Sequence, residues 1–127
     1  MLLEISEIVK PIVFDRNVQM VVLYRIDGIP LLTEIKERNM RMLNVLFHLE
    51  NQIKSMLYYI FNRNIDEVSF KFKDTVIRMY PISRTLVLAI MASDEFSLYK
   101  LEADIESVCD RIRELVRYER KDDLHAL

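Results

Sequence analysis

The chain has 127 residues, a single glycine, a single cysteine, no tryptophan and a formal net charge of -2. A chain of this length predicts one domain that buries roughly two-thirds of its unfolded surface, enough for a core without disulfides or metals. Loops that cradle phosphate need several glycines, because only glycine lets the backbone N–H groups close around the anion. The composition therefore excludes nucleotide binding by a P-loop or a Rossmann turn.

The charge balance limits the class of partner. The 18 basic residues are matched by 20 acidic ones, without a block of about five like charges, so the chain lacks the basic patch of a nucleic-acid-binding protein. A lone cysteine cannot form an internal disulfide, and no charged-then-apolar leader opens the chain, which together indicate a cytoplasmic protein. The longest apolar stretch, residues 86–92, is far shorter than the ~18 residues of a membrane span. No transmembrane segment is therefore predicted.

The first predicted elements are a short helix and a β-hairpin. Apolar residues recur at helical spacing over the first 12 positions, and the helix should end or kink at Pro11, because proline lacks the N–H that a helix interior requires. Two apolar segments, 20–26 and 29–35, then flank Asp27 and Gly28. This pair supplies the positive φ angles of a tight hairpin turn.

A long helix and three strands follow. Residues 39–62 keep the helical period without an internal Pro or Gly, and Asn39 is placed to cap the start of this helix. Residues 68–73 alternate strictly between apolar and polar, 75–82 form a less regular strand, and 85–92 are continuously apolar.

A closing amphipathic helix completes the pattern. Its apolar residues step by three and four, after Ser93 and Asp94 as candidate caps; they are Leu98, Leu101, Ile105, Val108, Ile112 and Leu115. The segment after this helix is charged and unpatterned. We therefore predict one domain over residues 1–118 and a flexible tail over 119–127.

The strand patterns predict the order of the sheet. Segments 20–26 and 85–92 are apolar on both faces, which a strand tolerates at the covered centre of a sheet. With strands one and two as a hairpin and strands three to five as a meander, the strand order becomes 2-1-5-4-3. The predicted fold class is α+β: a single α-β-β-α-β-β-β-α sandwich with a five-stranded antiparallel sheet and helices on both faces.

The two edges of this sheet differ. The second strand carries Pro30, which cannot donate to a ladder and closes its edge. The third strand has no proline and presents Val68, Phe70 and Phe72 on one face. A two-fold partner could pair its own third strand with this open edge.

The long helix carries more apolar surface than one sheet requires. At roughly 100° per residue, two neighbouring apolar stripes together span about 200°, whereas packing on a sheet needs about 100°. The first stripe consists of Leu43, Leu46, Ile53, Leu57 and Ile60, and the second of Met42, Val45, Leu49, Met56 and Tyr59, with the polar Gln52 among them. The second stripe predicts an interface with a partner. The alternative is a helix deeply buried within a monomer.

Candidates for catalysis are sparse. His48 lies on the polar side of the long helix and His125 in the predicted tail, and a histidine on a solvated helix face is far more often a surface residue than a general base. Cys109 lies among apolar residues of the last helix, which indicates a buried, inert thiol. No pattern predicts an active site, a cofactor or a metal site.

The element order and two segments resemble the Roadblock family. The segment 22–31, Val-Leu-Tyr-Arg-Ile-Asp-Gly-Ile-Pro-Leu, is similar to the family's first strand, Asp-Gly turn and second strand. The segment 96–102, Phe-Ser-Leu-Tyr-Lys-Leu-Glu, is similar to its entry into the last helix. The resemblance covers roughly residues 2–118 and implies a Roadblock/profilin-like fold.

The resemblance also implies a dimer. Roadblock proteins join through their third strands with the long helices side by side, and small Ras-like GTPases often dock there. The positions that correspond to the dimer interface are Val68, Phe70, Phe72, Val45, Leu49, Met56 and Tyr59. The family commonly has small residues on that helix, whereas this chain has larger ones.

The resemblance therefore implies a non-catalytic homodimeric adaptor or regulator that binds a small Ras-like GTPase, as a scaffold or as an activator. No arginine stands out as a catalytic finger, because Arg38, Arg41 and Arg63 are equally explained as solvated helix ends. The alternative is a small-ligand sensory module of the PAS or GAF kind, although few polar residues converge to orient a ligand.

Overall fold

The computed structural model describes residues 1–36, 41–63 and 65–126, with the side chains of Met42 and of residues 118–126 outside the description. Arg38 and the predicted cap Asn39 also lie outside the described residues. In chain order the elements are α1 (Leu2–Val13), β1 (Val18–Arg25), β2 (Pro30–Ile35), α2 (Met42–His48), α3 (Glu50–Arg63), β3 (Val68–Phe72), β4 (Thr75–Pro81), β5 (Leu86–Ala92), α4 (Glu95–Lys100) and α5 (Glu102–Ala126).

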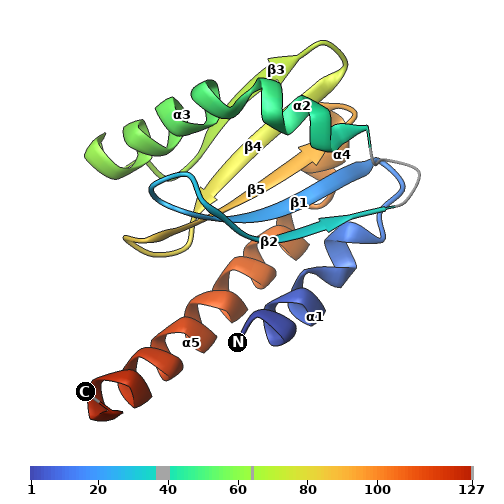
Figure 1. Ribbon diagram of the computed structural model, residues 1–127. Helices are drawn as coiled ribbons and strands as arrows, with labels where there is room; N and C mark the ends of the chain where they lie inside the picture. The colour runs from blue at the N-terminus through green and yellow to red at the C-terminus, as the bar shows by residue number, and fades with distance from the viewer. Residues whose placement is uncertain (37–40, 64, 127) are drawn as a thin grey trace.

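The fold is a three-layer α+β sandwich. The five strands pair antiparallel in the order β2-β1-β5-β4-β3, which confirms the predicted sheet. Helices α1 and α5 lie on one face and α2 with α3 on the other (Figure 1). Each face has its own buried apolar cluster. Every residue of β5 is buried, as expected for a central strand covered on both faces.

The hairpin between β1 and β2 requires its glycine. Gly28 has a φ of +95°, in the left-handed region that residues with a Cβ avoid. Its N–H donates to the carbonyl oxygen of Arg25 at 2.8 Å, and the N–H of Arg25 donates to the carbonyl oxygen of Ile29 at 2.8 Å. The Arg25 guanidinium also pairs with the Asp27 carboxylate at 2.5 Å. These contacts confirm a turn at Asp27 and Gly28, but only Gly28 has the positive φ that was predicted for both residues.

Replacing Gly28 with alanine is expected to destabilise the fold by about 1–2 kcal/mol, because an added Cβ makes a positive φ costly. That Cβ would lie 2.9 Å from Cγ of Lys54, a flexible side chain that can move aside. Urea unfolding measures the loss. The variant Lys54→Ala, alone and combined with Gly28→Ala, separates the backbone cost from the contact with Lys54. An unchanged unfolding midpoint would show that the turn relaxes.

The edge strand β2 is irregular. Leu23 pairs with Leu32 and Tyr24 with Pro30, so Leu31 is one extra residue on β2 and the register shifts there. This is the geometry of a β-bulge, which locally disrupts a ladder. The proline and the bulge thus lie together at the start of the same edge.

The first helix continues beyond the residue where an end was predicted. Pro11 lies inside α1, which runs to Val13. The proline removes one helical hydrogen bond, yet the N–H of Phe14 still donates to the carbonyl oxygen of Lys10 at 2.9 Å. Ile12, just after the proline, is fully buried between α1 and the sheet. Tertiary packing therefore stabilises the last turn. Of the two outcomes predicted at Pro11, an end or a kink, the end is wrong.

Both long helical segments are broken once, whereas each was predicted as continuous. Leu49 separates α2 from α3 with φ -97° and ψ 6°, and Leu101 separates α4 from α5 with φ -91° and ψ 2°. Both leucines are buried. No Pro or Gly marks either break. Each break bends the chain where a leucine side chain enters the core, so burial rather than a helix-breaking residue accounts for the position.

The last helical pair begins with a side-chain cap. The Asp94 carboxylate accepts hydrogen bonds from the N–H of Ser97 at 2.7 Å and from its hydroxyl at 2.9 Å, as the sequence predicts for Asp94. At the other end, the backbone of residues 119–126 continues α5. The division at 118/119 into a domain and a flexible tail stays a prediction.

Candidate functional site

The strand β3 is one of the two edges of the sheet. It pairs with β4 alone, so its outer side carries backbone groups without a strand partner. Val68, Phe70 and Phe72 are half-buried and pack against the apolar cluster beneath α3. Ser69 and Lys71 alternate with them and are exposed. The edge is therefore open and has one apolar face.

A groove runs between this edge and α3. Its volume is about 400 Å³, and its lining residues are Asn51, Gln52, Ser55, Met56, Phe70, Lys71 and Phe72. Met56 is half-buried and contributes its side chain to the core cluster. Tyr59, one turn later, is 46% exposed, and the Arg63 guanidinium lies 5.3 Å from its ring centroid. The structure thus brings together strand and helix residues that the sequence assigned to one interface.

Two further members of the predicted interface, Leu49 and Val45, contact the core beneath the helices. Leu49 is only 3% exposed and belongs to the core with Ile53 and Leu57. Val45 is half-buried against the same cluster, and the side chain of Met42 is outside the description. Leu49 is therefore part of this chain's own core, because at roughly 100° per residue it lies only about 40° from Ile53 around the helix.

An exposed apolar stripe on the opposite side of α2 and α3 was not predicted. Its members are Leu43 (39% exposed), Phe47 (76%), Tyr58 (66%) and Phe61 (60%). Leu43 was predicted to face the sheet, and its exposure corrects that assignment. On an ideal helix the four residues share an arc of about 60°, so the signal was present in the sequence. The stripe flanks two grooves, lined in part by Tyr24 and Pro30 and by Ile26 and Asp27 of the β1–β2 hairpin.

Charged side chains lie on the other face of β3. Lys71 is 3.9 Å from Glu95 of α4. The Nε atom of Arg78 is 2.9 Å from a Glu67 carboxylate oxygen, within ion-pair distance but without the geometry of a hydrogen bond. Because Glu67 is half-exposed, this pair contributes little to stability. The face of β3 opposite the groove therefore carries polar and charged side chains.

The candidate catalytic side chains are not arranged as an active site. His48 is exposed, and its ring centroid lies 6.2 Å from the ring centroid of Phe47. Cys109 is buried, and Arg41 and Arg63 are exposed at helix ends. The side chain of His125 lies outside the description. Within the described residues, no three His, Cys, Asp or Glu side chains gather as metal ligands, and no helix has the length and apolar character to cross a bilayer.

Three acidic protons, on two buried side chains and one half-buried side chain, make the free energy of unfolding depend on alkaline pH. Burial raises the pKa of Tyr24 and of Tyr80 to about 12, from 10.0, and the pKa of the Cys109 thiol to about 11, from 9.0. The folded protein thus retains these protons after the unfolded chain has begun to lose them. Their contribution is complete below pH 9 and is lost as the pH rises toward 11 and 12.

Stability should therefore fall by about 1.4 kcal/mol per pH unit for each proton that only the folded state retains. Urea unfolding between about pH 8 and about pH 10.5 measures this slope. The variant Cys109→Ala should show a shallower slope at the lower end of that range. A midpoint independent of pH would contradict the assignment of these groups to the core.

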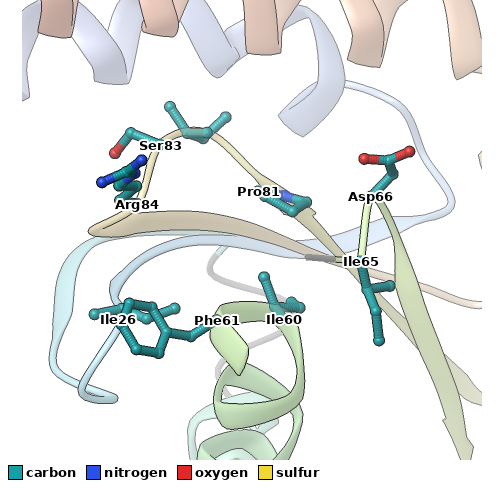
Figure 2. Close-up of a pocket in the computed structure, with 9 residues that line it drawn as sticks. Ile26, Ile60, Phe61, Ile65, Asp66, Pro81, Ser83 and Arg84 are labelled. Carbon is teal, nitrogen blue, oxygen red and sulfur yellow. The ribbon is translucent and has the colours of Figure 1, made fainter. Parts of the chain in front are cut away.

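A further pocket of about 400 Å³ lies at one end of the sheet, between α3 and the β4–β5 turn. Figure 2 shows Ile60, Phe61 and Ile65 on the α3 side of the strands, with Asp66 and Ser83 extending on the other side. Ligand sites of sensory modules combine an apolar body with convergent polar groups. In this pocket the polar groups do not converge on the apolar side chains.

Solved structures share this architecture. The chain is similar to MglC from Myxococcus xanthus (15% identity, TM-score 0.66, covering 84% of this chain and 97% of that one) and to MglB from the same organism (13%, 0.69, 91% and 96%). It is also similar to a Roadblock/LC7 domain from Streptomyces avermitilis (14%, 0.57, 92% and 98%). At these identities the likeness shows the fold, which is that of the Roadblock domain, as the sequence resemblance implied.

Sequence comparison identifies the family. Among curated proteins no relative matches the chain. The model of one family, described as AF0774-like protein, matches residues 2–106. This range includes α1, the whole sheet, α2, α3 and the start of α5. The chain has the Roadblock fold. By its sequence, it belongs to the AF0774-like protein family.

Proposed function

We propose that the protein is a non-catalytic homodimeric adaptor or regulator that binds a small Ras-like GTPase. The observation that carries the proposal is the open β3 edge beside the groove under α3. One apolar surface is formed by Val68, Phe70 and Phe72 of the strand together with Met56 of the helix. A second copy would cover this surface. Open sheet edges next to apolar faces are natural sites of strand pairing.

The exposed stripe on α2 and α3 supports the second part of the proposal. Phe47, Tyr58 and Phe61 are each at least 60% exposed, and aromatic residues are enriched at protein interfaces. The stripe lies on the hairpin side of the helices, away from the β3 groove. A GTPase could therefore dock on this stripe while a second copy occupies β3. We assign GTPase docking to Leu43, Phe47, Tyr58 and Phe61.

Light scattering at micromolar concentration tests the homodimer, and co-elution with the Ras-like GTPases of the same genome tests the partner. We expect the mass of two chains, and co-elution that Phe47→Glu abolishes without changing that mass. Phe14→Glu is the matched control, because Phe14 is 73% exposed at the end of α1. Loss of co-elution in both variants, or in neither, would contradict docking on the stripe.

Phosphate release separates a scaffold from an activator. If the protein orders the catalytic groups of the GTPase, GTP hydrolysis should rise when the two are mixed; a scaffold should bind without changing the rate. Arg41→Ala and Arg63→Ala then test whether either exposed arginine reaches the nucleotide. The absence of both co-elution and any change in hydrolysis would overturn the GTPase proposal.

A further inference from the structure

A pocket between α2 and the β1–β2 hairpin combines apolar walls with one charged side chain. Its volume is about 360 Å³, within the range of about 300–1,000 Å³ that is typical of ligand sites. Its lining residues are Tyr24, Gly28, Pro30, Leu43, Leu46, Phe47, Glu50 and Ile53. Among these lining residues Glu50 alone carries a charge. Leu43 and Phe47 also belong to the exposed stripe, so a partner that docks on the stripe covers this pocket.

The carboxylate of Glu50 makes this pocket negative. Glu50 lies in the first turn of α3, and its side chain is 55% exposed. Burial raises the pKa of Tyr24, and the negative charge of Glu50 raises it further, so the field of the carboxylate reaches a second lining residue. A negative charge beside apolar walls favours a group with an apolar stem and a cationic head.

An ammonium group of this chain already lies beside the Glu50 carboxylate. The Nζ atom of Lys54 is 3.1 Å from a Glu50 oxygen, and both side chains are at least half-exposed. An exposed ion pair of this kind contributes little to stability. A carboxylate also accepts several hydrogen bonds on its two oxygens. A cation that enters the pocket can therefore share the carboxylate with Lys54 or displace Lys54 from it.

The ring of Phe47 distinguishes between the two cationic side chains. Phe47 lines the same pocket as Glu50 and is 76% exposed. A guanidinium group stacks on aromatic rings and donates two parallel hydrogen bonds to a carboxylate, whereas a lysine ammonium acts as a strongly hydrated point charge. An aromatic ring and a carboxylate in one apolar pocket thus suit arginine better than lysine.

We propose that this pocket binds an arginine side chain of the docked partner, with its aliphatic stem against Leu46 and its guanidinium group on the Glu50 carboxylate beside the ring of Phe47. This inference rests on the proposed docking of a GTPase on the stripe. It adds the chemistry of the contact: one desolvated cation within an otherwise apolar interface.

Calorimetric titration with the GTPase that co-elutes tests the role of Glu50. Glu50→Gln keeps the size of the side chain and removes its charge, so it should weaken binding at least about tenfold, the loss expected for a hydrogen bond to a charged group. The matched control is Glu114→Gln, at an exposed glutamate of α5, which should bind as the parent does. Equal binding by Glu50→Gln and the parent would overturn the proposal and leave docking on the stripe intact.

A variant of Lys54 separates a contact with the partner from a structural role of the ion pair. Lys54→Met removes the competing ammonium group and keeps an apolar stem over Gly28, where the Lys54 stem lies in the parent. Binding should become tighter, because the carboxylate is then free for the partner. If Lys54→Met weakened binding as much as Glu50→Gln does, the ion pair itself would be the requirement, and the proposal would be overturned.

The arginine is identified on the partner. Each exposed arginine of the GTPase is changed to methionine, and one variant should lose binding as Glu50→Gln does. Combining that variant with Glu50→Gln should add little further loss, because both changes remove the same contact. Independent losses for every arginine variant would show that arginine does not occupy the pocket.

A small probe tests the pocket if no GTPase co-elutes, a result that overturns the proposed function. n-Propylguanidine has the side chain of arginine, and n-propylurea is its neutral isostere. In amide NMR spectra the guanidine should shift the signals of Phe47 and Gly28 more than the urea does, and Glu50→Gln should abolish the difference. Equal shifts from the two probes, or none, would overturn the arginine pocket as well.

Discussion

The variant Phe70→Asp is expected to be a monomer at concentrations where the parent protein is a dimer. Phe70 lies at the centre of the open edge and lines the groove beside α3. In the dimer, an aspartate at this position would be buried without a partner charge. This raises the free energy of the dimer by about 3 kcal/mol or more and weakens association roughly 100-fold. Light scattering across a dilution series measures the shift.

The matched control for this variant is Phe14→Asp. Phe14 is an exposed aromatic residue at the end of α1, remote in sequence from β3 and outside its groove. The control should keep the parent mass. Because Phe70 also packs against the core cluster, circular dichroism must show that the monomeric variant is folded. A folded Phe70→Asp variant that keeps the parent mass would exclude β3 from the interface.

A second large effect is expected for Leu49→Ala. Leu49 is almost fully buried beneath the break between α2 and α3, and truncating a buried leucine costs about 2–5 kcal/mol through lost burial and the cavity left behind. The unfolding midpoint in urea should fall accordingly. Dimer mass should not change, because the side chain does not reach the surface.

Met56→Ala is the contrasting variant. Its half-buried side chain lines the groove beside β3, so its truncation should weaken the dimer more than it destabilises the fold. Comparing both variants in the Phe70→Asp background removes the coupling between dimerisation and unfolding. If Leu49→Ala instead weakened the dimer and left the fold unchanged, Leu49 would belong to the interface, as the sequence pattern predicted.

The sheet could be predicted because its signals are local. The Asp27-Gly28 turn permits a tight hairpin, and Pro30 marks an edge. Continuous apolar runs identified the two central strands. These features depend on backbone conformation and on alternation along a few residues, so a single sequence contains them. The predicted strand order follows from them and is confirmed.

The bends of the helices could not be predicted in the same way. The residues at Leu49 and Leu101 are good helix formers, and only the shape of the sheet beneath them decides that each bends there. The candidate site was misassigned for a different reason. At roughly 100° per residue, Leu49 lies only about 40° from the buried Ile53, and Leu43 lies about 40° from the exposed Phe47. Both leucines therefore stand at the border of their predicted stripes, and the structure places Leu49 in the core and leaves Leu43 exposed.

The unequal edges of the sheet bear on how far assembly can proceed. Pairing through β3 would cover the open edge of both copies. The two edges of the combined sheet would then both be β2 strands. Each of those begins with Pro30 and carries the bulge at Leu31, features that oppose further strand addition. Association through this sheet is thus self-limiting. Its mass should reach a plateau at two chains, however high the concentration, rather than growing into fibres.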